Sequence, residues 1–223
     1  MQALLDHEDR GVAYRIAVLI VDRACAAEER ARGNGRAVCR VDFGQPGAGA
    51  RVLDELGRHA VRGILLAGFL KLLPAEVCRA YRNRILNIHP ALLPSFGGKG
   101  MYGGRVHQAV LDAGAKLSGP TIHFVNERYD EGRILAQWPV PVLPDDTAQS
   151  LAARVLEVEH LLYPAAADAL ARRLAGGDGG KGSAEYAGSP HLAALRFRWP
   201  ATGAHAAAGL GESIRNAFGG AVE

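Results

Sequence analysis

The sequence predicts an α/β fold, a Rossmann-like and mostly parallel sheet with helices on both faces. Near-continuous apolar runs rich in Val, Ile and Leu recur along the chain, as is typical of strands covered on both faces. These runs alternate with segments of helical character, which favours parallel strands joined by helices. In such folds ligands bind outside the carboxyl ends of the strands, so we look for chemistry where apolar runs give way to polar residues.

Six segments are predicted to be strands. The first is YRIAVLIV, which is almost entirely apolar, and the fourth is RILNIH, which Pro90 ends because proline cannot donate to a ladder. The last two are joined by a polar loop like the strands of a hairpin, which predicts a mixed sheet. In chain order the predicted strands are 14–21, 37–43, 62–69, 84–89, 120–125 and 134–142.

Helices are predicted between these strands. Gly11 ends the first, and Asp146 with Gln149 three residues later resembles a capping box at the start of the last. Pro164 marks a point where this long last helix can break. The predicted helices are 2–10, 22–33, 52–59, 75–81, 106–113 and 147–174, with loops at 44–50 and 90–104.

Composition limits the class of protein. The 223 residues fit one α/β domain, here 1–174, followed by a flexible low-complexity tail at 175–223 that opens with AGGDGGKGS. A net charge of +3 without a basic run argues against nucleic acid. No stretch resembles a membrane span or a signal peptide, so we expect a cytoplasmic protein. The three cysteines are far apart and predict neither disulfides nor a zinc site.

The fourth predicted strand ends in a polar pair. Asn87 and His89 are two residues apart, so their side chains point to the same face of the sheet. By itself this pattern fits a catalytic pair and a hydrogen-bonded turn equally well. The loop 126–132, which follows the strand containing His123, supplies carboxylates near the same edge. An Asp beside a His can keep an imidazole charged and oriented, although an acidic loop alone is usually only solvated.

Taken together, residues 84–164 closely resemble phosphoribosylglycinamide formyltransferases. The resemblance rests on motifs in a fixed order: NIHP, LLP, SGPTIHFV, the DEG turn and EHLLYP. It implies transfer of a formyl group from 10-formyltetrahydrofolate, a co-substrate, to the amine of phosphoribosylglycinamide in purine biosynthesis. It also implies small-molecule partners, with no metal, nucleic acid or membrane, and a monomer or homodimer. The formal GxGxxG at 98–103 does not directly follow a strand, so it more plausibly shapes a loop beside the site.

The resemblance also assigns roles to residues. It implies that Asn87 and His89 lie at the formyl carbon and that Asp130 keeps His89 protonated and organises a proton-carrying water. For His123 a structural role and a role in the site are equally favoured. The residues implied to bind folate are Leu70, Lys71, Leu72, Leu73, Asn87, Asn126 and Asp130, and Glu159 is implied to contact the glycinamide substrate.

Relatives begin with a strand and a glycine- and serine-rich loop that cradles the substrate phosphate, whereas this chain opens with MQALLD, inside the helix that follows. The resemblance places that strand between 14–21 and 62–69. We hypothesise that Met1 is an internal methionine, which intact-mass analysis of the native protein tests. The alternatives are an inactive or folate-binding-only remnant, or another enzyme that uses 10-formyltetrahydrofolate. Residues 175–223 are too short for the basic barrel of a methionyl-tRNA formyltransferase, and the extra N-terminal domain of a formyltetrahydrofolate hydrolase is not seen.

Overall fold

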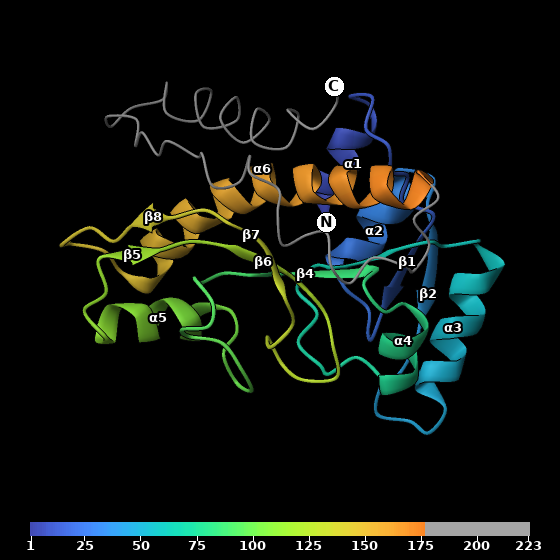
Figure 1. The fold of residues 1–223 in the computed structure, drawn as a ribbon, viewed down its shortest axis with the longest axis horizontal. Coiled ribbons are helices and arrows are strands. Elements are labelled where there is room, and N and C mark those ends of the chain that lie inside the picture. The colour runs from blue at the N-terminus through green and yellow to red at the C-terminus, as the bar shows by residue number, and fades with distance from the viewer. Residues whose placement is uncertain (177–223) are drawn as a thin grey trace.

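The computed structural model describes residues 1–176, and the predicted tail lies almost entirely outside them. These residues form the expected α/β fold (Figure 1). The helices are α1 Gln2–Glu8, α2 Ala26–Gly33, α3 Ala48–Arg58, α4 Ala75–Ala80, α5 Gly104–Asp112 and α6 Ala148–Ala175. The strands are β1 Val18–Val21, β2 Ala37–Arg40, β3 Ile64–Leu66, β4 Ile85–His89, β5 Leu117–Ser118, β6 Thr121–Phe124, β7 Ile134–Gln137 and β8 Val140–Pro141.

Strand pairing is parallel where strands alternate with helices and antiparallel after the fourth strand. β1 pairs with β2 and β3 pairs with β4 in parallel, whereas β6 is antiparallel to both β4 and β7. The mixed sheet predicted from the last hairpin is therefore confirmed. The predicted strand 134–142 is divided into β7 and β8. The pairing of β8 with β5 was not predicted, because a two-residue strand such as β5 carries no usable periodicity.

Helices cover both faces of the strands, and alternate residues of β3 show this. Leu65 packs against the cluster that contains Leu170 of α6, whereas Ile64 packs against the cluster that contains Leu56 of α3. Figure 1 shows α1 and α6 on one side of the strands and α3 and α4 on the other. A strand buried on both faces needs apolar residues at every position, which explains the near-continuous apolar runs.

The strands do not form one continuous sheet. Within residues 1–176 the ladders form a β1–β2 pair and a separate β3–β4–β6–β7 sheet, and no strand lies between β1 and β3. A cavity of about 550 Å³ occupies this gap and is lined by both strands. We call this gap the strand slot. It lies where the resemblance places a strand, between 14–21 and 62–69.

The last helix differs from the prediction at its start. Thr147, not Asp146, is the N-cap: its hydroxyl accepts from the Ser150 N–H at 3.1 Å, and the Ser150 hydroxyl accepts from the Thr147 N–H at 2.9 Å. Asp146 instead accepts two hydrogen bonds from the Arg154 guanidinium, at 2.7 and 2.8 Å. The helix continues through Pro164 without a break, because packing on both sides offsets one missing backbone hydrogen bond.

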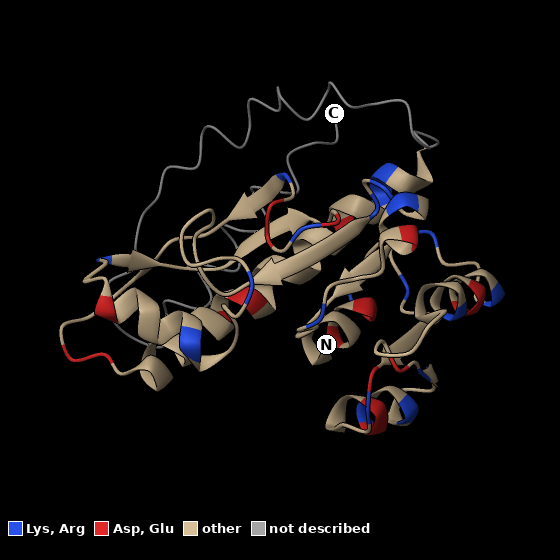
Figure 2. Ribbon diagram, turned by 90° about the horizontal axis from the view of Figure 1, so that it is seen from below, with Lys and Arg blue, Asp and Glu red and all other residues tan. Residues whose placement is uncertain are grey.

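Positions of Lys and Arg and of Asp and Glu are interspersed along the ribbon of the described residues (Figure 2). None of the helices in residues 1–176 is both long and apolar enough to cross a bilayer.

Candidate active site

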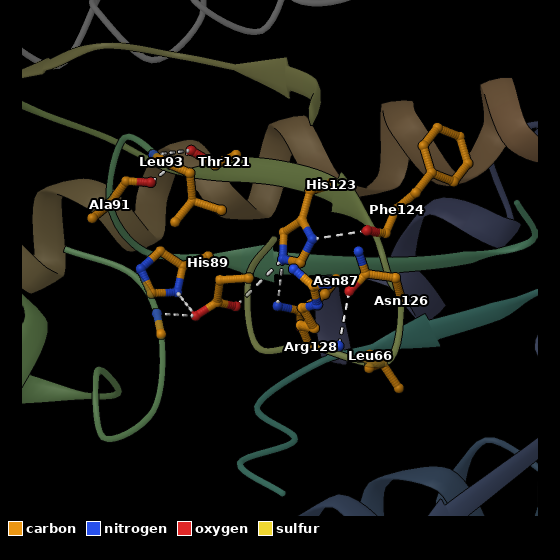
Figure 3. Close-up of polar contacts among 12 residues, drawn as sticks. Leu66, Asn87, His89, Ala91, Leu93, Thr121, His123, Phe124, Asn126 and Arg128 are labelled. Atoms are coloured by element: carbon orange, nitrogen blue, oxygen red, sulfur yellow. Dashed lines mark hydrogen bonds and ion pairs between the residues drawn. The ribbon is translucent and has the colours of Figure 1, made fainter. Parts of the chain in front are cut away.

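The pairing of β4 with β6 builds the centre of the site. Asn87 lies opposite His123 in this antiparallel ladder, so both side chains emerge on one face. The Asn87 Nδ2 and His123 Nε2 atoms are 3.1 Å apart, and the His123 ring is 2 % exposed (Figure 3). His123 therefore belongs to the polar cluster, which sequence reasoning left open.

Asp130 links two buried imidazoles. Its Oδ2 lies 3.6 Å from the Nδ1 of His89, and its Oδ1 lies 3.5 Å from the Nε2 of His123. The Gly98 N–H donates to Oδ2 at 2.9 Å, so the glycine-rich loop contacts the cluster as expected. Burial alone would raise the pKa of Asp130, but its contacts with His123, Gly98 and His89 together lower this pKa below the usual 3.8. Asp130 is thus a buried carboxylate held in its charged form.

The backbone around Asp130 is locally strained. Asp130 has a φ of +55° and Phe96 a φ of +57°, a left-handed conformation that is unfavourable for residues other than glycine. The Phe96 carbonyl accepts a hydrogen bond from the His89 Nε2 at 2.9 Å. Both strained residues therefore place a polar group against His89, which indicates that the surrounding packing fixes this arrangement.

Burial and Asp130 shift the pKa of His89 in opposite directions. The residue is 3 % exposed, and burial lowers its pKa below the usual 6.5, despite the opposing effects of Asp130 and the Phe96 carbonyl. Removal from water disfavours the imidazolium more strongly than a carboxylate 3.6 Å away favours it. Asp130 therefore raises the pKa of His89 in the sense that the resemblance implies, but burial lowers it further.

Hydrogen bonding also orients the Asn87 amide. The Nδ1 of His123 lies 3.0 Å from the Phe124 carbonyl, and its Nε2 faces both the Asn87 amide nitrogen and the Oδ1 of Asp130. The contact with His123 is the one hydrogen-bond contact of the Asn87 amide nitrogen among the described residues, and an amide nitrogen carries two N–H donors. One amide N–H of Asn87 remains without a protein partner among the described residues, which makes it available to a ligand oxygen.

A second group of hydrogen bonds fixes the loop after β4. The Thr121 hydroxyl donates to the Ala91 carbonyl at 2.6 Å and accepts from the Leu93 N–H at 3.0 Å. The Gln137 amide reaches both the Leu93 carbonyl and the Thr121 hydroxyl, at 2.8 and 2.9 Å. Figure 3 shows the two bonds of Thr121, to Ala91 and Leu93. The proline-containing loop is therefore fixed from β6 and β7.

Some of the residues that the resemblance assigns to folate binding are exposed near the site, whereas others are packed or bonded within the protein. Leu66 pairs with Asn87, so the segment after β3 begins beside the site. Leu70 and Leu72 are 50 % and 43 % exposed and available to an apolar ligand. Lys71 pairs with Asp22 at 3.3 Å. Leu73 instead packs in the cluster beneath α3 and α4.

Asn126 shapes its own loop. Its side-chain oxygen accepts from the Arg128 N–H at 2.9 Å, and its carbonyl lies 3.5 Å from the Cys78 sulfur. The side-chain oxygen is therefore already engaged in the turn that leads to Asp130.

Glu159 lies apart from the His–Asp cluster, on α6. Burial raises its pKa to about 7, and the amino group of Met1 opposes this shift. When folding raises the pKa of a carboxyl group, the folded state is favoured at low pH, where the group is protonated. This stabilisation is lost as the pH rises from about 4.5 towards 7, because the unfolded chain ionises the group more readily than the folded chain. Glu159 therefore destabilises the folded chain in alkaline solution, which is typical of a group retained for function.

We predict that Glu159→Gln raises the melting temperature at pH 8, where it removes a buried charge, and has little effect at pH 5, where the native carboxyl is already neutral. Thermal unfolding at both pH values measures this. The exposed Glu157→Gln is the matched control, with no such pH-dependent gain. A gain for Glu159→Gln that is equal at the two pH values would contradict the raised pKa.

Tyr163 is a residue that sequence reasoning did not assign, although it belongs to the EHLLYP motif. Its hydroxyl lies 2.8 Å from the Leu66 carbonyl and 3.0 Å from the Leu86 carbonyl. It therefore joins α6 to both β3 and β4 immediately before the segments that form the site. A tyrosine on the apolar face of a long helix was the available signal, because a buried hydroxyl needs a partner.

We predict that Tyr163→Phe lowers the free energy of unfolding by about 1–3 kcal/mol, because the carbonyls of Leu66 and Leu86 lose the one hydroxyl donor that lies between them. Urea denaturation measures this. Tyr102→Phe, at a tyrosine that is 38 % exposed, is the control and should change stability by less than about 0.5 kcal/mol. Equal effects of the two substitutions would mean that the bridging hydroxyl contributes nothing.

Fold and site together define a Rossmann-like α/β protein with an amide, two imidazoles and a carboxylate at the carboxyl edge of its sheet. The family described as "Formyl transferase" matches residues 14–167, so the chain belongs to the formyl transferase family.

Named relatives agree with this assignment. The chain is 50% identical over 161 residues to phosphoribosylglycinamide formyltransferase, chloroplastic, of Arabidopsis thaliana, covering 70% of this chain and 55% of that protein. It spans about half the length of the curated relatives it matches.

Solved structures of similar proteins share the fold. Glycinamide ribonucleotide transformylase 1 from Symbiobacterium toebii superposes with a TM-score of 0.71 at 38% identity, covering 77% of this chain and 81% of that one. Phosphoribosylglycinamide formyltransferase from Brucella melitensis gives 0.69 at 41% identity, covering 77% and 88%. A formyltetrahydrofolate deformylase from Pseudomonas syringae gives 0.60 at 26% identity, covering 69% and 52%.

No group of three or more His, Cys, Asp or Glu side chains in residues 1–176 is arranged to hold a metal ion. The cysteines are unpaired, and Cys78 is buried.

Proposed function

We propose that this protein transfers a formyl group from 10-formyltetrahydrofolate to the amine of phosphoribosylglycinamide, a step of purine biosynthesis. The observation that carries the proposal is the convergence of Asn87, His89 and Asp130, from two separate segments, on one point at the sheet edge. The relatives and structures named phosphoribosylglycinamide formyltransferase support it.

In this proposal the substrate amine attacks the formyl carbon and a new C–N bond forms. Negative charge develops on the formyl oxygen as the carbon becomes tetrahedral, and the available N–H of Asn87 stabilises it. His89, neutral before the reaction, takes the proton released by the amine. Asp130 then stabilises the imidazolium, because a carboxylate favours a cation that forms beside it.

Collapse of the tetrahedral intermediate breaks the bond between the formyl carbon and the folate nitrogen. That nitrogen receives the proton from His89, directly or through a water held by Asp130, so the base is restored. The products are the formylated glycinamide and tetrahydrofolate. The Nε2–H of His89 donates to the Phe96 carbonyl, so in this proposal the nitrogen that takes and returns the proton is Nδ1, which faces Asp130.

The remaining assignments follow from position. Leu70 and Leu72 are exposed beside the site and supply apolar contacts to the folate, with Lys71 at the same surface. Leu73 and Asn126 support these segments from behind. Glu159 binds the glycinamide substrate through its half-buried carboxyl, where a bound ammonium group would favour the ionised form.

A turnover assay with both substrates tests the proposal, with tetrahydrofolate production as the readout. Formylated glycinamide should appear in equimolar amount with tetrahydrofolate. Tetrahydrofolate with free formate would instead indicate a deformylase. A folate analogue that raises the melting temperature of a chain without turnover would indicate a folate-binding-only protein.

We further propose that residues 1–174 are the catalytic unit and that the protein acts on small molecules in the cytoplasm, as a monomer or homodimer. The end of α6 at Ala175 agrees with this boundary. Sedimentation of the full chain distinguishes the two assembly states.

A further inference from the structure

A second pocket of the described chain lies apart from the His–Asp cluster. Its volume is about 420 Å³, and its residues come from the end of α4, the turn after that helix, and both ends of the loop that joins β6 to β7. None of Asn87, His89, His123 and Asp130 lines it. The volume is within the range of small-molecule sites in proteins. The pocket is therefore a candidate binding site of its own.

The charged side chains that line this pocket are mostly cationic. Arg79, Arg82 and Arg133 line it together with one carboxylate, that of Glu127, and we call it the arginine pocket. Three positive charges against one negative charge leave an excess of two positive charges. A concave surface lined by one sign of charge concentrates ions of the opposite sign. The arginine pocket therefore favours an anion.

Two of the three guanidinium groups are held in place by contacts within the protein. The Arg133 guanidinium lies over the buried ring of Phe124, 4.7 Å from its centroid. The Arg79 Nη1 lies 3.2 Å from the Glu127 Oε1. Arg82 makes no ion pair with any residue of 1–176. Cations that are already positioned lose less side-chain entropy when a ligand binds, which favours affinity.

Backbone carbonyls near the pocket would oppose an anion if they were left open. The last carbonyls of a helix carry partial negative charge, and α4 ends beside the pocket. The Arg84 guanidinium donates to the Ala80 carbonyl, and the Arg173 guanidinium donates to the Asn83 carbonyl. Two further cations thus cover these oxygen atoms, so the negative end of α4 does not cancel the charge of the pocket.

We propose that the arginine pocket binds a small anion that carries two or more negative charges on phosphate or carboxylate oxygen atoms. A guanidinium group presents parallel N–H donors that match the oxygen atoms of either group. A divalent anion compensates the excess of two positive charges, whereas a monovalent anion compensates only half of it and an uncharged ligand none. This inference does not depend on the catalytic proposal.

Glu127 gives the proposal a test of sign. Its carboxylate already contacts Arg79, so it competes with an incoming anion for that cation and repels the anion. Removing this charge should therefore strengthen anion binding, whereas removing the charge of Arg82 should weaken it. Two substitutions in one pocket are thus expected to act in opposite directions.

Titration calorimetry on the full chain, at constant ionic strength set with sodium chloride, tests the proposal with pyrophosphate and citrate as separate probes. Saturable binding of at least one probe is expected, and the tighter probe distinguishes phosphate from carboxylate recognition. Arg82→Gln should weaken that binding by about fivefold or more, and Glu127→Gln should strengthen it by about twofold. Arg58→Gln is the matched control, since Arg58 is 65% exposed like Arg79 and is also paired with a carboxylate.

Three results would overturn the proposal. The first is the lack of saturable binding of either probe by the native chain. The second is equal weakening by Arg82→Gln and Arg58→Gln, which would show attraction by net charge alone. The third is binding that is lost in Lys71→Gln but kept in Arg82→Gln, which would place the anion at the candidate active site. Arg82 is exposed, so unchanged melting temperatures should confirm that its variant is folded.

Discussion

Replacing His89 with alanine lowers kcat/KM for formyl transfer by about 10²–10⁴-fold, the range expected when a general acid–base group is lost. The ring is almost fully buried and lies against both the Phe96 carbonyl and Asp130. Steady-state kinetics with both substrates measures the loss. His59→Ala, at a half-buried histidine of the α3 end paired with Glu55, is the matched control and should retain full activity.

The pH profile of the native enzyme gives a second test of His89. Its neutral form is the base, and burial lowers its pKa below 6.5. As the pH falls, kcat/KM should therefore decrease first near pH 7, as Glu159 is protonated, and again below 6.5, as the imidazole takes up a proton. The second decrease should persist in Glu159→Gln and disappear in His89→Ala. A kcat/KM for Glu159→Gln that instead falls as the pH rises through 6.5 would mean that the protonated ring is the active form and that the assigned role is reversed.

Replacing Gly132 with alanine destabilises the protein by about 3 kcal/mol and displaces the loop that carries Asp130. A Cβ at this position would meet the backbone carbonyl oxygen of Phe124 far inside van der Waals contact. No rotamer change relieves a clash with backbone, and Phe124 is fixed by its N–H bond to the Arg133 carbonyl at 2.8 Å. Urea unfolding measures the stability, and the turnover assay measures the displacement of Asp130.

Gly57→Ala is the matched control for this substitution. Gly57 lies within α3 with open space around it, so alanine there should raise helix stability by about 0.5–1 kcal/mol. The two substitutions are thus predicted to change stability in opposite directions. A tolerated Gly132→Ala with normal activity would show that the turn before β7 is free to move, and the fixed position of Asp130 would have to be abandoned.

The sequence predicted the elements well where hydrophobic patterning was strong. The runs around 14–21, 62–69 and 84–89 all contain strands, although each strand is shorter than its run. For β1 and β3 the reason is physical: without a partner on the slot side, residues at the ends of the runs have no ladder to join. The wrong cap of α6 has a simpler cause, since adjacent Asp146 and Thr147 both suit an N-cap and only packing selects between them.

The site was predictable in its members but not in its electrostatics. The spacing of Asn87 and His89 fixed their shared face, and the resemblance supplied Asp130. The place of His123 depended on antiparallel register, which sequence alone does not give. The direction of the His89 pKa shift depends on burial, which outweighs the effect of the neighbouring carboxylate and cannot be read from the sequence. The contacts of Tyr163 depend on how closely α6 approaches β3 and β4.

The division of the apolar interior into two clusters has a consequence for folding cooperativity. One cluster joins α5 and α6 to β4, β6 and β7, whereas the other joins α3 and α4 to residues of β1, β2, β3 and β4. Within residues 1–176 no ladder connects the β1–β2 pair to the larger sheet, so side-chain packing and single polar contacts, such as that of Lys71 with Asp22, couple the N-terminal third to the rest. We expect that third to open at a lower free energy than global unfolding, so proteases should cleave it first while His89 and His123 remain enclosed.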